Sequence, residues 1–218
     1  MKTNEELQKD VQDAIKWEPL LNAAEIGVTV KEGVVSLTGT VDAYAKKVEA
    51  ENAVKKVKGV KAVVEEIKVK YDNWAEKTDE EIANEILFAL DWNWKIPKDK
   101  VTVKVENRGV TLEGEVNWNA QRDAAKTVAA NCIDVKYVTN NITIKSETKD
   151  KVEKLELYKA FKRSWLLEDK NILVNVVDDK VTLHGNVMSW YQKDEAGRIA
   201  WNAPGVVSVN NEITIDYL

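Results

Sequence analysis

The fold is decided by the stretch Gly33-Val34-Val35-Ser36-Leu37-Thr38-Gly39-Thr40-Val41, because the chain repeats its pattern twice more. Residues 108–116 read RGVTLEGEV, and residues 179–187 read DKVTLHGNV. The shared glycines Gly39, Gly114 and Gly185 lie 75 and then 71 residues apart. Solenoid repeats have periods of roughly 20–50 residues, so a repeat of this length is a small domain. The sequence therefore predicts three copies of one domain, at residues 1–72, 73–146 and 147–218.

Hydrophobic periodicity predicts the same elements in every copy. Leu7, Val11 and Ile15 recur along one face of a helix, and Ile82, Ile86 and Leu90 repeat this spacing 75 residues later. Two strands with alternating apolar residues follow, and a tight turn joins them, as at residues 31–33.

A second helix then carries mostly small apolar residues, and a third strand closes each copy. The order is α-β-β-α-β, which predicts an α+β fold with two helices on one face of a three-stranded mixed sheet. The opposite face of the sheet is expected to be polar, with Thr29, Ser36 and Thr38 in the first copy. Gly59 and Gly205 are expected to end the second helix, whereas Asp134 in the middle copy predicts a looser end.

These residues resemble the BON domain, named for bacterial osmotically induced and nodulation proteins. The resemblance rests on the V-x-L-x-G-x-V strand, the small-residue helix and the ending Gly205-Val206-Val207-Ser208-Val209-Asn210-Asn211-Glu212-Ile213. It covers nearly the whole chain in three tandem repeats, as in osmotically inducible periplasmic BON proteins. The resemblance implies a module without known catalysis, often linked to the envelope and osmotic stress, and proposed to bind phospholipid or other ligands.

Composition and motifs argue against several classes of protein. The formal net charge is −5, and no repeat has the basic excess of a nucleic-acid binder. Cys132 lies at an apolar helix position and His184 at an outward strand position, so neither is expected to be catalytic or to bind metal. The sequence has no phosphate-binding glycine motif. We expect no enzyme, no cofactor, no nucleic-acid partner and no transmembrane segment.

Tryptophan is unusually frequent, with eight residues. Trp17, Trp92 and Trp165 recur near the end of the first helix, which favours packing between helix and sheet. Other aromatic residues fall in the segment between the second strand and the second helix, which we expect to be a loop. These residues are the candidate ligand or lipid contacts: Tyr44, Trp118, Trp190 and Tyr191. They can equally pack locally or between domains.

Two functions remain open at the level of sequence. The first is a non-enzymatic binding or scaffolding protein that contacts a phospholipid surface, a small ligand or a protein through the candidate aromatic residues. The alternative is a structural stress protein that acts by transient protein contacts without a dedicated site. The amino terminus has no apolar segment of a signal peptide, so the expected location is cytoplasmic, or periplasmic if an export signal was trimmed. The sequence leaves the oligomeric state open.

Overall fold

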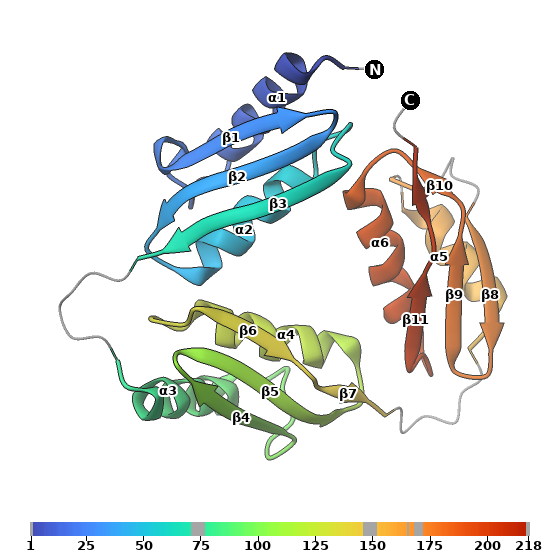
Figure 1. Cartoon of the computed structure of the whole chain (residues 1–218). Helices are drawn as coiled ribbons and strands as arrows, with labels where there is room; N and C mark the ends of the chain where they lie inside the picture. The colour runs from blue at the N-terminus through green and yellow to red at the C-terminus, as the bar shows by residue number, and fades with distance from the viewer. Residues whose placement is uncertain (1, 71–76, 146–151, 165, 168–171, 217–218) are drawn as a thin grey trace. The chain divides into compact units, whose positions relative to one another are not determined.

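The structure is a computed structural model of the chain, and it describes residues 2–70, 77–145, 152–164, 166–167 and 172–216. Within them, the predicted order α-β-β-α-β is confirmed in all three repeats (Figure 1). The first repeat contains α1 (Asn4–Lys16), a 3₁₀ turn (Ala23–Glu25), β1 (Ile26–Lys31), β2 (Val34–Val41), α2 (Tyr44–Lys55) and β3 (Ala62–Val69). The second contains α3 (Asp79–Trp92), β4 (Val101–Glu106), β5 (Gly109–Val116), α4 (Asn119–Asn131), β6 (Tyr137–Asn140) and β7 (Thr143–Ile144). The third contains α5 (Lys154–Arg163), β8 (Leu173–Val177), β9 (Lys180–His184), β10 (Asn186–Val187), α6 (Trp190–Trp201), β11 (Ser208–Asn211) and β12 (Thr214–Ile215).

The repeated motif forms the middle strand of every sheet. The strand orders are β1-β2-β3, β4-β5-β6 and β8-β9-β11, and the short strands β7 and β12 pair with β5 and β10. The first two strands of each repeat are antiparallel. The strands that follow the second helix run parallel to the motif strand in the second and third repeats, and Figure 1 shows β3 running in the same direction as β2. The predicted mixed sheet and its crossover are therefore confirmed.

The three hairpins share one register, with the motif leucine opposite a valine of the first strand. The pairs are Leu37 with Val28, Leu112 with Val103, and Leu183 with Val174. Two residues connect the strands in each case. In the first repeat these residues are Glu32 and Gly33, both with positive φ, as a tight hairpin turn requires.

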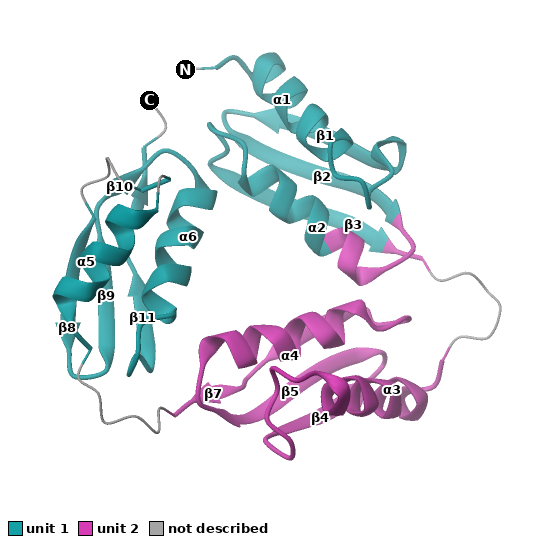
Figure 2. Ribbon diagram, turned by 180° about the vertical axis from the view of Figure 1, so that it is seen from behind, with its two compact units in different colours: residues 1–40, 48–68, 148–218 teal, residues 41–47, 69–147 magenta. Residues whose placement is uncertain are grey.

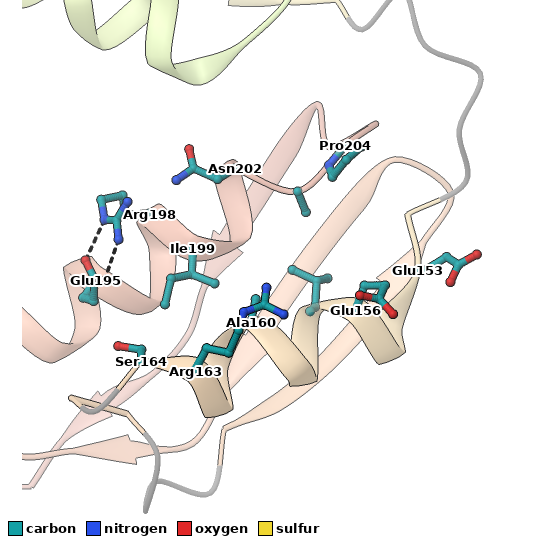
Figure 3. A pocket seen from close by; sticks show the side chains of 12 residues that line it. Glu153, Glu156, Ala160, Arg163, Ser164, Glu195, Arg198, Ile199, Asn202 and Pro204 are labelled. Atoms are coloured by element: carbon teal, nitrogen blue, oxygen red, sulfur yellow. Dashed lines mark hydrogen bonds and ion pairs between the residues drawn. The ribbon is translucent and has the colours of Figure 1, made fainter.

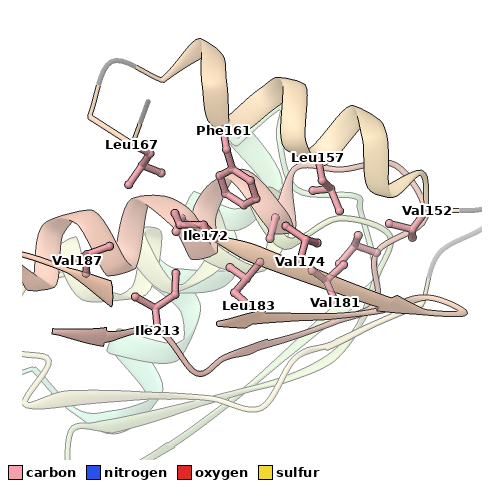
Figure 4. Close-up of a cluster of buried hydrophobic side chains, with 13 residues drawn as sticks. Val152, Leu157, Phe161, Leu167, Ile172, Val174, Val181, Leu183, Val187 and Ile213 are labelled. Atoms are coloured by element: carbon pink, nitrogen blue, oxygen red, sulfur yellow. The ribbon is translucent and has the colours of Figure 1, made fainter. Parts of the chain in front are cut away.

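Each repeat buries its own apolar residues between its helices and its sheet. Leu37, Leu112 and Leu183 are fully buried, and so are the predicted helix residues Val11 and Ile82. Figure 4 shows the core of the third repeat, in which Leu157 and Phe161 of α5 lie over Val174, Leu183 and their neighbours. The prediction of matching, helix-backed cores is confirmed.

The motif glycine is required by a close approach of the backbone. Gly39 and Gly114 have φ values of 127° and 140°, and an added Cβ would lie 2.0 Å from the carbonyl oxygen of Glu25 or Lys100. No side chain fits at that distance, and L-residues rarely adopt such a φ. This explains why glycine marks the register of the repeats.

The asparagine near the end of each later repeat bridges an interruption in the third strand. The Nδ2 groups of Asn140 and Asn211 donate to the carbonyl oxygens of Arg122 (3.0 Å) and Lys193 (2.7 Å) in the preceding helix. Their Oδ1 atoms accept from the backbone N–H groups of Ile142 and Ile213. The asparagine thus ties the third strand to the preceding helix at the point where the strand is interrupted.

Asp134 takes the place of the helix-terminating glycine without the expected loosening. Its φ of 69° lies in the left-handed region, like those of Gly59 and Gly205. Its carboxylate is buried and accepts a hydrogen bond of 3.0 Å from the backbone N–H of Lys77, directly ahead of α3. The hydrogen bond links the end of α4 to the start of α3 within the second repeat.

By contacts between Cα atoms the chain divides into two compact units (Figure 2). One unit comprises residues 1–40, 48–68 and 148–218, and the other comprises residues 41–47 and 69–147. Each sheet nevertheless takes all its strands from a single expected repeat. The exact repeat boundaries stay a prediction.

Candidate functional site

The outer face of each sheet is polar, as predicted. Thr29, Thr38, Thr102 and Glu113 are exposed there. His184 occupies the equivalent position in the third repeat, and its Nδ1 lies 3.1 Å from a carboxylate oxygen of Glu212. Both side chains of this pair are about half exposed, so the pair is a surface contact of small energetic value.

Cys132 is a core residue, as the sequence predicted. Its side chain is buried, and its Sγ lies 3.4 Å from the carbonyl oxygen of Val128. Burial raises the pKa of the thiol to about 11. The thiolate form that a nucleophile or a metal ligand needs is therefore disfavoured at neutral pH.

The residues that the structure describes contain no group of three or more His, Cys, Asp and Glu residues that could hold a metal ion. None of the described helices is both long and apolar enough to cross a bilayer.

Trp17 and Trp92 stand in solvent, so for these two tryptophans the prediction that they pack between helix and sheet was wrong. Trp17 follows the last residue of α1 and is 84% exposed, and Trp92 ends α3 and is 76% exposed. Trp165 lies outside the described residues. The buried stripe of each helix is already filled by aliphatic residues such as Ile15 and Leu90. Trp17 and Trp92 lie two residues further along the chain, off this stripe, and point outward.

The outward face of α3 carries an aromatic pair. Phe88 is 66% exposed, and its ring centroid lies 5.8 Å from that of Trp92, one helical turn away. Glu80 and Glu81 precede the pair in the first turn of the helix, and Lys95 follows its end. This face is therefore acidic at one end, aromatic in the middle and basic at the other end.

A second exposed aromatic residue lies in the loop after α3. Trp94 is 88% exposed, and the Nζ of Lys95 lies 5.6 Å from its ring centroid. Lys98 and Lys100 follow in the same exposed loop. The loop therefore presents an exposed indole close to three exposed lysines.

The four candidate residues lie at the start of the second helix of each repeat instead of in a loop. Tyr44 and Trp190 are the first residues of α2 and α6, Tyr191 is the second residue of α6, and Trp118 is the N-cap of α4. Trp118 and Tyr191 are 39% and 45% exposed, whereas Tyr44 and Trp190 are half-buried. They do not occupy one equivalent position, because Asn119 stands where Tyr44 and Trp190 stand in the other repeats.

A groove with a volume of about 900 Å³ lies between α5 and α6 (Figure 3). Its apolar floor is formed by Leu157, Ala160, Ile199 and Ala203. Charged groups stand at its two ends. Glu153 and Glu156 lie at the start of α5, while Arg163 is its last residue.

The charges along this groove differ in how they are paired. Arg198 binds both carboxylate oxygens of Glu195 at 2.6 and 2.7 Å, and Glu156 pairs with Lys159 at 2.7 Å. The hydrogen bond from Lys159 lowers the pKa of Glu156. Arg163 makes no ion pair with any residue that the structure describes, so its guanidinium is available at the end of the groove.

The equivalent groove is altered in the other two repeats. In the second repeat it has a volume of about 790 Å³, and Trp92 stands on its edge at the position of Arg163. In the first repeat Lys56 and Glu18 replace Asn202 and Ser164, and they form an ion pair of 2.9 Å that links the ends of α2 and α1. The hydrogen bond with Glu18 raises the pKa of Lys56. The three repeats therefore share a fold but not a surface.

Sequence reasoning missed the exposed face of α3 and the groove. The spacing of four between Phe88 and Trp92 was present, but the helix also has a complete aliphatic stripe at Ile82, Ile86 and Leu90. Two apolar stripes on one helix are the signal that could have identified an exposed aromatic face. The groove has no comparable signal, because it depends on how α5 packs against α6.

Comparisons with known proteins place these observations in context. The BON domain family matches residues 3–71, 78–146 and 150–217. No curated protein sequence matches the chain.

Among solved structures, the chain is similar to CdsD, a structural protein of the type III secretion system of Chlamydia trachomatis. The two share 16% identity over 95% of this chain and 91% of that chain, with a TM-score of 0.27. The chain shares 16% identity with the C-terminal domain of CdsD over 99% of this chain and 100% of that chain, with a TM-score of 0.26. It shares 8% identity with the PrgH periplasmic domain over 89% of this chain and 95% of that chain, with a TM-score of 0.20. Likenesses of this size assign no activity.

Proposed function

This chain belongs to the BON domain family, and on that basis we propose that it is a non-enzymatic binding and scaffolding protein. The proposal is carried by one observation, which is that large aromatic side chains stand in solvent at the ends of the first helices. Exposed apolar groups that cluster on a surface favour contact with a partner surface. Phe88 and Trp92 of α3 and Trp94 of the loop after it are such groups.

The absence of catalysis in this proposal is supported by the two residues best suited to chemistry. The thiol of Cys132 is buried, and its pKa is raised to about 11. His184 lies on the exposed sheet face beside Glu212. Neither arrangement provides an activated nucleophile with a base beside it.

A phospholipid surface is the contact that Trp94 favours. The indole can enter the interfacial region, and Lys95, Lys98 and Lys100 can approach lipid phosphates. Each lysine near an anionic surface contributes about 1 kcal/mol, and this contribution is screened by salt. The net charge of −5 opposes binding, so the proposed contact is weak and limited to anionic membranes.

Co-sedimentation with vesicles tests this contact. The full chain is expected to sediment with phosphatidylcholine–phosphatidylglycerol vesicles and to be released as salt is raised. Trp94→Ser is expected to weaken binding about tenfold, since it removes the most exposed of the indoles that the structure describes. Trp17→Ser, which removes an equally exposed indole without the three lysines, is the matched control and should bind within about twofold of the unaltered chain.

Three of the four candidate residues, Trp118, Trp190 and Tyr191, are tested in the same assay by a separate set of variants. Trp190→Ala with Tyr191→Ala is expected to lower vesicle binding and leave the unfolding transition unchanged, as is Trp118→Ala. A large loss of stability would identify these rings as packing residues. If the unaltered chain does not sediment with any vesicle, the lipid contact is excluded, and the alternative of a structural protein acting by transient protein contacts is favoured.

A further inference from the structure

The outward face of α3 and the groove between α5 and α6 are complementary in apolar character, charge and length. The face comprises Glu80, Glu81, Phe88, Trp92 and Lys95, and we refer to it as the α3 face. We propose that the α3 face of one molecule docks into the groove of the third repeat of a second copy, so that the protein assembles head to tail. This inference goes beyond the proposed function and does not depend on lipid binding.

The first argument is apolar complementarity. Phe88 and Trp92 form an exposed aromatic pair, and solvent exposure of two adjacent large rings is unfavourable. The floor of the groove is built from small or aliphatic side chains, Ala160, Ile199 and Ala203. Alanine at two of these positions lets the backbone of a third helix come close while the two rings fill the groove, which is the general mode of helix-in-groove recognition.

The second argument is charge complementarity along the helix. When α3 lies antiparallel to α5, its acidic first turn, Glu80 and Glu81, meets the basic last turn of α5, Lys162 and Arg163. Lys95, beyond the other end of α3, then meets Glu153. The parallel orientation would place like charges together at both ends. The charges therefore select one orientation.

The lengths of the two surfaces agree. At a rise of 1.5 Å per residue, Glu81 and Trp92 lie about 17 Å apart along α3, and Glu153 and Arg163 lie about 15 Å apart along α5. With Phe88 opposite Ala160, Trp92 lies opposite Glu156 and Leu157 of the same groove. The side chain of Arg163 then needs to span about one helical turn to reach Glu81, which an arginine can do.

The grooves of the other repeats do not offer the same site. In the second repeat the position of Arg163 is held by Trp92 itself. In the first repeat the ion pair between Lys56 and Glu18 crosses the equivalent position. The third repeat is thus the one whose groove combines an alanine floor with an available guanidinium.

Because the face and the groove are different surfaces, the contact is heterologous, and it adds copies in a chain or closes a ring. Sedimentation velocity over a range of concentrations tests this. The unaltered chain is expected to shift from monomer to dimer and larger species as its concentration rises. Phe88→Ser with Trp92→Ser removes the face, and Arg163→Glu with Ala160→Trp removes the groove. Each double variant is expected to weaken association at least tenfold.

Mixing the two double variants provides the decisive measurement. The face variant retains an intact groove and the groove variant retains an intact face, so the mixture is expected to form a one-to-one dimer that grows no further. Arg163→Glu alone is the control for misfolding caused by Ala160→Trp, and it should also weaken association. Lys126→Glu changes the net charge by the same amount on α4, and is expected to leave association unchanged.

Three results would overturn the proposal. One is a chain that stays monomeric at every concentration. Another is a mixture of the two double variants that stays monomeric although each is folded, which would indicate a contact of like surfaces. The third is equal loss of association in Lys126→Glu and Arg163→Glu. None of these results bears on sedimentation with vesicles, so failure of this proposal is distinguishable from failure of the lipid contact.

Discussion

At the scale of single residues, the three copies differ most where the second helix ends. Gly59 and Gly205 reach the left-handed conformation without steric cost. Asp134 reaches it as a non-glycine residue and uses its side chain to accept the backbone N–H of Lys77. The hydrogen bond offsets the conformational cost, and so the middle repeat keeps its geometry with a different residue.

Substitutions at this position are expected to separate the two effects. Asp134→Ala keeps the strained backbone and leaves the N–H of Lys77 without its acceptor, so it should destabilise the second repeat by about 1–3 kcal/mol. Asp134→Asn keeps an acceptor and tolerates the left-handed conformation, and should cost less than Ala. Urea unfolding checks the order. An alanine variant as stable as the unaltered chain would show that the hydrogen bond contributes nothing.

At the scale of elements, α1 and α3, the first helices of the first two repeats, begin with the same capping box. The hydroxyls of Thr3 and Thr78 each accept the N–H of a glutamate three residues on, at 3.2 Å. Glu6 and Glu81 return a carboxylate to the threonine N–H at 2.8 Å. The hydrogen bonds from the threonine N–H groups lower the pKa of both carboxyls most, and the hydrogen bonds with the threonine hydroxyls lower it further.

The capping box makes α3 sensitive to acid. Because folding lowers the pKa of Glu81, its stabilisation is fully present above the pKa of an unfolded glutamate, about 4.3, and is lost as pH falls through the lower folded value. Carboxyl NMR titration should therefore show Glu6 and Glu81 titrating below the ordinary value of a glutamate. Titration at the ordinary value would contradict the capping geometry.

Removal of the cap threonine gives a matched test of the same element. Thr78→Ala is expected to destabilise the second repeat by about 1 kcal/mol, because an N-cap hydrogen bond is lost. Thr127→Ala, in the middle of α4, should leave stability unchanged or raise it, since alanine favours the helix interior. Urea unfolding of both variants checks the difference.

How far the elements could be predicted depends on whether their signal is local. The alternation around Leu37, Leu112 and Leu183 predicted the strands, and hairpin register followed from the tight turns. The strand order could not be read, because it depends on where the third strand pairs. The tryptophans were misassigned for a similar reason: recurrence at Trp17 and Trp92 reflects the repeat, whereas burial depends on which residues already fill the core.

At the scale of the whole molecule, the fold is repeated while the surface diverges. Each motif strand has a buried leucine. The groove between the two helices differs: an ion pair bridges it in the first repeat, Trp92 stands on its edge in the second, and Arg163 lies at its end in the third. A scaffold of this kind maintains three similar cores and varies what each repeat presents to a partner.

A core substitution tests whether these cores act separately. Leu183→Ala is expected to cost about 2–5 kcal/mol in the third repeat, because the leucine is fully buried. Leu173→Ala, at a largely exposed position of the adjacent strand, should change stability by no more than about 0.5 kcal/mol. Hydrogen exchange read by mass spectrometry should show faster exchange across β8, β9 and β11 only. Faster exchange throughout the chain would mean that the repeats unfold as one unit.

The two-residue connection within each hairpin also bears on how a chain of three similar repeats avoids misfolding. Adjacent copies of one fold can exchange equivalent strands while the chain is still collapsing. A connection this short closes at small entropic cost, so the first two strands of a repeat find each other before a distant competitor arrives. Only the third strand comes from beyond a helix. We therefore expect exchange between repeats to involve the third strand more readily than the hairpin.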